Sequence, residues 1–159
     1  MAETLVEELL RKSGNTIYRF GYEAILQNLT QLERSFDGDA DAGKRIRAIP
    51  DFIVIDKNGK PTFLEVKFRW NGELHRDDHE RLQRIKNFWN AKIIIVNCLE
   101  RPYFRISFPP YFNQFEEFAT TALSEEVSWS IDPTQYKESE KLVEKYLRPT
   151  LLKETREGK

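Results

Sequence analysis

The 159-residue chain has a single cysteine, Cys98, and no apolar stretch near the roughly 20 residues that a membrane-spanning helix needs. One cysteine excludes an internal disulfide and suits a reducing compartment. The first residues are acidic and form no apolar signal segment, so we expect a cytoplasmic protein without a membrane partner. The chain also lacks an excess of positive or negative charge. The 25 Lys and Arg residues stand against 26 Asp and Glu residues, whereas nucleic-acid-binding domains often have a basic excess.

The chain does contain enough apolar material for a folded domain. Hydrophobic residues make up 40% and aromatic residues 13% of the sequence, which argues against a disordered chain. The length lies within the usual range of one domain that buries its own core. We therefore expect a single α/β domain over residues 1–150, followed by a frayed tail over 151–159.

The charges are distributed unevenly along the chain. Residues 44–60 contain five basic and two acidic side chains, and residues 67–86 contain six basic and four acidic ones. The acidic excess lies mainly in the first ten residues and in 116–144. A locally basic surface would suit contacts with phosphate groups. The alternative is that these are ordinary solvated charges.

The periodicity of the apolar residues predicts the order of the elements. Helices are expected over residues 2–12, 22–33, 114–123 and 133–147. A further helix is expected to begin at a cap at Asp77 or Asp78 and to end at Trp89. Strands are expected over residues 16–20, 51–55, 62–68, 93–96 and 103–108. Residues 37–43 are expected to form a loop. The run at 93–96 is Ile-Ile-Ile-Val, which is typical of a central strand covered on both faces.

The most informative segment is an expected hairpin that carries three charged residues. An Asn-Gly dipeptide at 58–59 between two apolar runs is a strong hairpin signal. A two-residue loop would pair Asp51 with Val66 and place Asp51 on the face opposite to Glu65. A three-residue loop, with the glycine as a bulge, would pair Asp51 with Glu65. We expect the three-residue loop, because only that register brings Asp51, Glu65 and Lys67 together.

The face that these charged residues would share is otherwise apolar, since it also holds Ile53, Ile55 and Phe63. A mostly apolar face with a few convergent charges is typical of a functional pocket. The alternative is structural. Asp51 would cap a turn after Pro50, and Glu65 and Lys67 would be neighbouring charges on an exposed strand.

These residues resemble the motif of the PD-(D/E)xK nuclease superfamily, and within it most resemble archaeal Holliday-junction resolvases. In that family, a helix with a glutamate leads through a glycine to a strand that ends in arginine, and the matching residues here are Glu3, Gly14 and Arg19. The aspartate strand, Asn-Gly-Lys turn and Glu-x-Lys strand match Asp51, 58–60 and 65–67. The similarity covers most of residues 2–98. Two departures are the long link at 21–49 and the chain beyond Val96.

The resemblance implies a restriction-endonuclease-like core of the order αβββαβ, with a mixed sheet flanked by helices. A helical insertion would occupy about 21–49, and a C-terminal helical extension would occupy about 110–148. The implied activity is that of a metal-dependent endonuclease, which hydrolyses phosphodiester bonds of DNA. Structured or branched DNA is one candidate substrate.

The resemblance also implies a metal site. Asp51 and Glu65 would bind Mg²⁺ or Mn²⁺ with the backbone carbonyl of Val66, and hard cations prefer such oxygen ligands. Lys67 would position the attacking water or offset the charge of the transition state.

A further acidic residue usually comes from the first helix of this superfamily. Glu3 matches it by alignment, and Glu23 and then Glu8 are the alternatives. Contacts with DNA are expected from Lys44, Arg45, Arg47, Arg69, Trp70 and Gln83. For Arg69 the alternative is a surface salt bridge.

Two weaker metal patterns are expected to be ordinary surface. The acidic stretch 37–43 lacks the glycine and the final glutamate of a calcium loop. His75 and His79 are one helical turn apart, but no further zinc ligand is evident in the sequence.

Two other functions stay open. One is a catalytically silent nucleic-acid-binding or assembly module on the same fold. The other is an endonuclease of restriction or of mobile DNA, in which residues 22–49 would read the sequence. We expect a homodimer, because resolvase-like enzymes cut two strands and a two-fold dimer supplies two sites. A stripe in the last helix could cover the core or a partner subunit, and it comprises Leu142, Val143, Tyr146 and Leu147.

Overall fold

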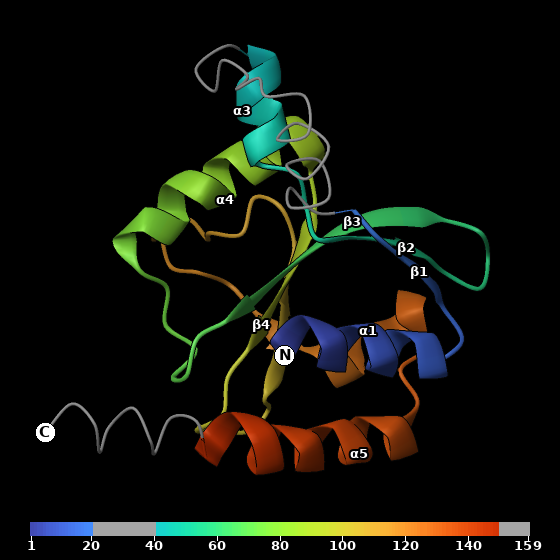
Figure 1. Ribbon diagram of the computed structural model, residues 1–159. Coiled ribbons are helices and arrows are strands. Elements are labelled where there is room, and N and C mark those ends of the chain that lie inside the picture. The colour runs from blue at the N-terminus through green and yellow to red at the C-terminus, as the bar shows by residue number, and fades with distance from the viewer. Residues whose placement is uncertain (21–40, 150–159) are drawn as a thin grey trace, which may run out of the picture.

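The structure is a computed structural model, and it describes residues 1–20 and 41–149 (Figure 1). A six-stranded sheet forms its centre, in the order β1-β2-β3-β4-β5-β6. The strands are β1 (Thr16–Arg19), β2 (Phe52–Ile55), β3 (Pro61–Phe68), β4 (Lys92–Val96), β5 (Phe104–Ser107) and β6 (Thr121–Ala122). Strands β3 and β4 are parallel, and all other neighbours are antiparallel. The predicted α/β class with a mixed sheet is confirmed.

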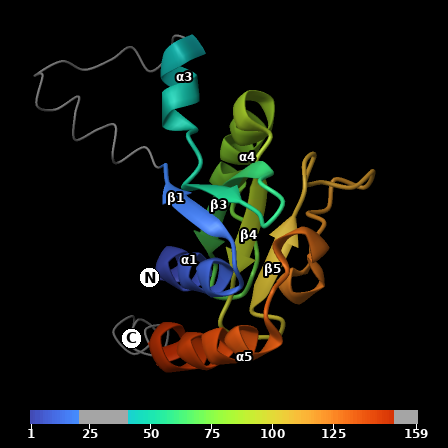
Figure 2. The ribbon, with the colours of Figure 1, turned by 90° about the vertical axis from the view of Figure 1, so that its right-hand side faces the viewer.

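Helices cover both faces of this sheet. They are α1 (Ala2–Lys12), α3 (Asp41–Arg47), α4 (Arg76–Trp89) and α5 (Pro133–Leu142), and the π-helical turn η3 (Val143–Leu147) continues α5. Two 3₁₀ turns, η1 (Leu123–Glu125) and η2 (Val127–Trp129), precede α5. Figures 1 and 2 show α1 and α5 on one side of the sheet and α4 on the other. None of the helices within the described residues is long and apolar enough to cross a bilayer.

The ends of the outer helices follow from their sequences. Helix α1 ends at Lys12, and Gly14 follows its C-cap, Ser13; the φ of 99° at Gly14 suits glycine, and an added Cβ would lie 2.4 Å from Lys57 Cε. At the start of α5, the Asp132 side chain accepts the N–H of Gln135 at 2.9 Å. Pro133 occupies the first helical position, where its missing N–H leaves no bond unmade. Both helix ends were predicted from the sequence.

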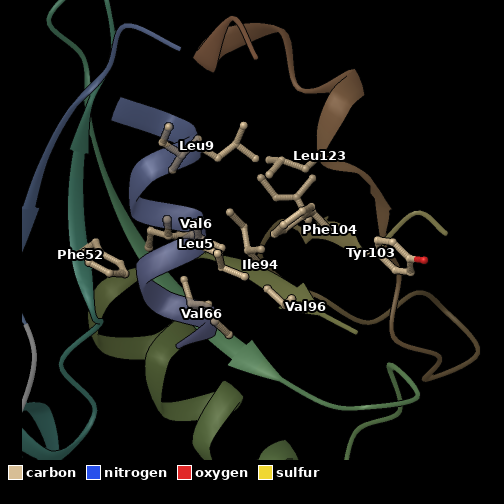
Figure 3. Packing of buried hydrophobic residues seen from close by; sticks show 14 of the residues in the cluster. Leu5, Val6, Leu9, Phe52, Val66, Ile94, Val96, Tyr103, Phe104 and Leu123 are labelled. Atoms are coloured by element: carbon tan, nitrogen blue, oxygen red, sulfur yellow. The ribbon is translucent and has the colours of Figure 1, made fainter. Parts of the chain in front are cut away.

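Strand β4 lies between β3 and β5 and is buried on both faces, as predicted. Ile94 and Val96 pack with α1 residues such as Val6 in one apolar cluster (Figure 3). Ile93 and Ile95 belong to a second cluster, under α4. The alternation of side chains along a strand explains this division.

The apolar stripe of the last helix covers the chain's own core. Val143 and Leu147 are buried in the same cluster as α1, and Leu142 packs against it. Tyr146 is 43% exposed.

The predicted helix over 114–123 is wrong. Phe112 forms a β-bridge with Phe118 there, and β6 follows. The Asn113 side chain accepts the N–H groups of Phe115 (2.9 Å) and Glu117 (3.0 Å). Such side-chain bonds compete with helical ones and hold a turn. The C-terminal extension is therefore helical only in its 3₁₀ turns and from Pro133 onward.

Two further boundaries need correction. The N-cap of α4 is His75 rather than Asp77 or Asp78, and the His75 N–H donates to Asp78 Oδ2 at 2.8 Å. Residues 41–43, expected in a loop, form the first turn of α3. The predicted helix over 22–33 and the rest of the predicted loop lie outside the described residues, and so does most of the insertion.

The packing of β4 makes a testable prediction. Ile94 is fully buried, so Ile94→Ala should lower the free energy of unfolding by about 2–5 kcal/mol, through lost burial and a residual cavity. Urea unfolding followed by circular dichroism would measure the change. As a control, Val127→Ala removes methyl groups from a side chain that is 87% exposed and should change the value by less than about 0.5 kcal/mol. Equal effects of the two substitutions would contradict the central position of β4.

Candidate active site

The β2–β3 hairpin has the register that the sequence favoured. Ile53 pairs with Phe63, and the Asp56 N–H donates to the Lys60 carbonyl at 3.1 Å. Gly59 has a φ of 80°, as a glycine bulge in a three-residue loop requires. One step beyond the paired residues, this register sets Asp51 opposite Glu65.

The Asp51 carboxylate ends the hairpin ladder. Its Oδ2 accepts the N–H of Val66 at 2.8 Å. The register would set Pro50 opposite Val66, but β2 begins only at Phe52, so the carboxylate supplies the acceptor that the main chain does not. Asp51 is thus held in place by β3 itself.

The surroundings of Asp51 disfavour its negative charge. Burial, then the charge of Glu65 and that of Glu3, raises its pKa to about 7, although the Val66 N–H and Arg81 act in the opposite direction. Two carboxylates that share a site repel each other, and the repulsion favours a proton or a cation between them. Glu3, on α1, therefore lies within electrostatic reach of Asp51.

Glu65 is nearly inaccessible, with 3% of its surface exposed. Its Oε1 accepts hydrogen bonds from Arg81 Nε (3.1 Å) and Nη2 (2.9 Å). Its Oε2 is buried and has no hydrogen-bond partner among the described residues. Burial raises the pKa of Glu65, even though Arg81 and Lys67 lower it. An unpartnered buried carboxylate oxygen is costly unless something binds it.

Lys67 shares the face of Glu65 but turns to α4. Its Nζ lies 3.4 Å from Asp78 Oδ1, and its side chain is 11% exposed. Arg69 also binds Asp78, through Nε to Oδ2 at 2.9 Å and through Nη2 to Oδ1. Burial would raise the pKa of Asp78, but hydrogen bonds from Arg69 and His75 and the charge of Lys67 lower it to about 2. Asp78 is therefore an anion shared by two cations, and the salt bridge offered as the alternative for Arg69 is present.

Sequence reasoning missed Asp78 and Arg81 as partners of the site. Both lie on α4 with Leu82 and Ile85, at the spacing i, i+3, i+4 and i+7, which forms one helical face. Asp78, Leu82 and Ile85 are buried on that face. The signal was present in the sequence, because two charges interrupt an apolar stripe that packs over the charged face of β3.

The other expected site residues are spread around this centre. Glu3 is half-buried on α1, whereas Glu8 is exposed on the same helix. Glu23 lies outside the described residues. Gln83 is exposed on α4, and Trp70, just after β3, is 45% exposed.

Helix α3 brings the basic segment next to α4. The Arg45 carbonyl accepts Trp89 Nε1–H at 3.1 Å, and the Arg47 carbonyl accepts Arg81 Nη1–H at 3.0 Å. Lys44 is half-buried, and the Arg45 and Arg47 side chains are exposed. Arg81 thus connects Glu65 to the helix that carries the expected DNA contacts.

The donor set fits a hard cation in part. Burial and the charge of Glu65 disfavour the negative charge of Asp51, and Oε2 of Glu65 has no hydrogen-bond partner among the described residues, so a cation at this place would stabilise both carboxylates. However, residues 1–20 and 41–149 contain no group of three or more His, Cys, Asp or Glu side chains that could hold a metal ion. Glu3 is therefore not placed as a third direct ligand, and His75 and His79 belong to no such group. The His79 ring instead stacks on Phe112, with centroids 4.9 Å apart.

Comparisons of the chain with models of protein families, with curated proteins and with solved structures find no match.

The electrostatics of Asp51 predict a stability effect. Its pKa of about 7 exceeds the ordinary 3.8, so the folded state binds more protons than the unfolded state between these values. Wild-type stability should therefore fall as the pH rises through this window. Asp51→Asn keeps an acceptor for the Val66 N–H and removes the charge, so it should raise the free energy of unfolding by about 1–4 kcal/mol at pH 8 in EDTA.

The comparison is made by urea unfolding at pH 8 and at pH 3.5, where the gain should disappear because both states are then largely protonated. Glu80→Gln is the control, since it neutralises an exposed carboxylate on α4. A gain for Asp51→Asn that is the same at both pH values would show that the charge is not its cause.

Proposed function

We propose that the chain is a metal-dependent endonuclease that hydrolyses phosphodiester bonds of DNA, with a PD-(D/E)xK-type site at Asp51, Glu65 and Lys67. Structured or branched DNA is the candidate substrate. The observation that carries the proposal is the hairpin register, which sets Asp51 opposite Glu65 and puts Lys67 on the face of Glu65. This is the one register in which a cation could contact both carboxylates.

The order of the elements supports the same proposal. Apart from α3, which stands between β1 and β2, helix α1, strands β1 to β3, helix α4 and strand β4 have the order expected of a restriction-endonuclease-like core. The antiparallel hairpin and the parallel β3–β4 pair give such a core its mixed sheet. Strands β5 and β6 and the C-terminal helix would be additions to it.

Asp51 and Glu65, with the Val66 carbonyl, would hold Mg²⁺ or Mn²⁺. When bound, the ion would supply a Lewis acid that activates water and offsets charge on the scissile phosphate. Arg81 binds Oε1 of Glu65 and thereby orients the carboxylate, which leaves Oε2 for the ion. Val66 N–H similarly fixes Asp51 through Oδ2. Glu3 would add negative charge and could reach the ion through a water molecule.

Lys67 would act on the phosphate rather than on the metal. Asp78 holds its ammonium group beside β3, so little orientational freedom remains to be lost when a substrate binds. A fixed positive charge next to the developing negative charge of the transition state lowers the barrier. The basic side chains of α3 (Lys44, Arg45 and Arg47), together with Trp70, would position the DNA.

A catalytically silent nucleic-acid-binding or assembly module is the second candidate. One specific observation favours it: Glu65 and Lys67 both have partners on α4, in Arg81 and Asp78. Buried ion pairs of this kind can be purely structural. Restriction or mobile-DNA cleavage is a variant of the first proposal and would assign sequence recognition to residues 22–49.

Cleavage tests separate the two candidates. With Mg²⁺ or Mn²⁺ and a panel of junction, flap, duplex and single-stranded DNA, the wild type should cleave at least one form. Asp51→Asn should abolish cleavage and weaken metal binding, because an amide is a poor ligand for a hard cation. Lys67→Ala should retain metal binding and lose about 10²–10³-fold in rate, since its charge acts on the transition state.

Lys12→Ala, an exposed lysine at the end of α1, is the matched control for the lysine and should cleave like the wild type. Cleavage by Lys67→Ala at the wild-type rate would refute the role of this lysine but leave the metal site standing. Normal cleavage by both site variants would place any activity elsewhere and favour the silent module.

The homodimer is a further part of the proposal. Paired cuts in two strands require two sites, which a two-fold axis supplies. Because Leu142, Val143 and Leu147 of the last helix pack on the chain's own core, the dimer interface would use another surface. Light scattering at tens of micromolar protein, with and without DNA, should give twice the mass of one chain. A monomer under both conditions would contradict the dimer.

A further inference from the structure

A small open pocket lies beside the candidate site, at the turn end of the hairpin. It has a volume of about 330 Å³ and lies between the start of β3, the end of α4 and the end of β5. Its charged and aromatic lining residues are Lys60, Phe63, Trp89, Lys92 and Phe108. Phe63 is two residues before Glu65 on the same strand face, which is roughly 7 Å along β3. The pocket therefore adjoins the face of the site at Phe63. Lys92 alternates with Ile93 and Ile95 and lies on the α1 side of the sheet, over Trp129, so the pocket extends around the end of the sheet.

The charges of the pocket are all of one sign. Lys60 and Lys92 line it, and no Asp or Glu of the described residues does so. Lys92 Nζ is half-buried over two rings, 4.7 Å from the centroid of Trp129 and 5.1 Å from that of Phe108. It forms a long salt bridge with Glu126 Oε1, at 4.0 Å, and donates a hydrogen bond to Ser128 Oγ at 3.4 Å. Burial and, to a smaller extent, the charge of Lys60 lower the pKa of Lys92, whereas the charges of Glu126 and Asp56 raise it. An anion between the two lysines would relieve the repulsion between them.

The other wall of the pocket is aromatic. Phe63 and Trp89 meet edge to face with centroids 5.2 Å apart, and Phe108 is 42% exposed at the mouth. Trp89 is also bound to the Arg45 carbonyl, so the basic helix α3 adjoins the pocket. Aromatic faces combined with lysines are the usual means of binding single-stranded nucleic acid, in which the bases are free to stack on protein rings. In a duplex those base faces are already stacked on each other.

We propose that this pocket binds a single-stranded segment of the DNA substrate next to the candidate active site. A phosphate would lie between Lys60 and Lys92, and a base would stack on Phe108. The inference rests on the proposed nuclease function for the identity of the ligand, and it adds that the cleaved DNA presents an unpaired strand at the hairpin turn. A flap or a branch point would supply such a strand, whereas an intact duplex would not.

The test is the binding of labelled oligonucleotides in EDTA, followed by fluorescence anisotropy, so that no cleavage occurs. The wild type should bind an oligothymidine strand more tightly than a blunt duplex of the same length. Phe108→Ala should weaken binding of the single strand about 5- to 100-fold, as expected for one stacked base. Lys60→Gln should weaken it too and reduce the slope of log affinity against log salt by about 0.7, the value for one phosphate contact in a single strand.

The chain offers matched controls for both changes. Phe115→Ala removes a ring that is 72% exposed and does not line the pocket, and Lys12→Gln removes an exposed charge at the end of α1 that does not line it either. Both controls should bind like the wild type. The proposal is overturned if Phe108→Ala and Lys60→Gln bind like the wild type, if the controls lose as much affinity as they do, or if the duplex binds as tightly as the single strand.

Binding and cleavage can fail separately in this design. Wild-type cleavage that Asp51→Asn abolishes, with single-strand binding unchanged in Phe108→Ala, would refute the pocket and keep the nuclease. Loss of single-strand binding in Phe108→Ala, with no cleavage by the wild type in any metal, would keep the pocket and refute the nuclease.

Discussion

The register of the β2–β3 hairpin is the constraint on which the rest of the site depends. Because side chains alternate along a strand, a shift by one residue would move Glu65 and Lys67 to the α1 side and leave Asp51 on the other face. The glycine at 59 selects the three-residue loop, since its positive φ is easily adopted without a Cβ. The conformation of this single turn residue thus decides which charges can meet.

Burying these charges requires partners, and helix α4 supplies them. Glu65 and Lys67 lie between the sheet and this helix, where an isolated charge would be strongly unfavourable. Arg81 forms an ion pair with Glu65, and Asp78 forms ion pairs with both Lys67 and Arg69. The same residues therefore hold α4 on the sheet and orient the charged side chains. A helix that packed on β3 through apolar contacts alone would leave the strand's charges unpaired, so the fold and the site share one set of interactions.

Much of the fold could be predicted from the sequence, because it depends on local signals. The ends of α1 and α5, the hairpin and the buried β4 each have a short and strong pattern, such as Gly14, Asp132-Pro133 or the run at 93–96. The segment 114–123 could not be predicted in this way, since Asn113 side-chain bonds and a β-bridge override its helical pattern. The approach of Asp51 and Glu65 was also predictable from the turn. The sequence does place Asp78 and Arg81 on the apolar face of α4. Which charge of β3 each of them contacts was not predictable, because it depends on how α4 is placed over the sheet.

The charges of the site are divided between two ends of one strand face. Asp51 and Glu65, with Glu3 nearby, have Arg81 as their compensating cation, which leaves a negative excess at that end. Lys67 and Arg69 share Asp78, which leaves a positive excess at the other. The three negative and three positive charges sum to zero; they are Asp51, Glu65 and Asp78 against Lys67, Arg69 and Arg81. Their separation therefore adds no net charge and is consistent with a chain whose formal charge is only −1. Under the proposed function, a cation would bind at one end and a phosphate at the other, and these are the two groups that metal-assisted phosphodiester hydrolysis must hold side by side. The weak net charge of the chain is therefore no argument against a phosphate substrate, because the local field, and not the total, acts on a bound group.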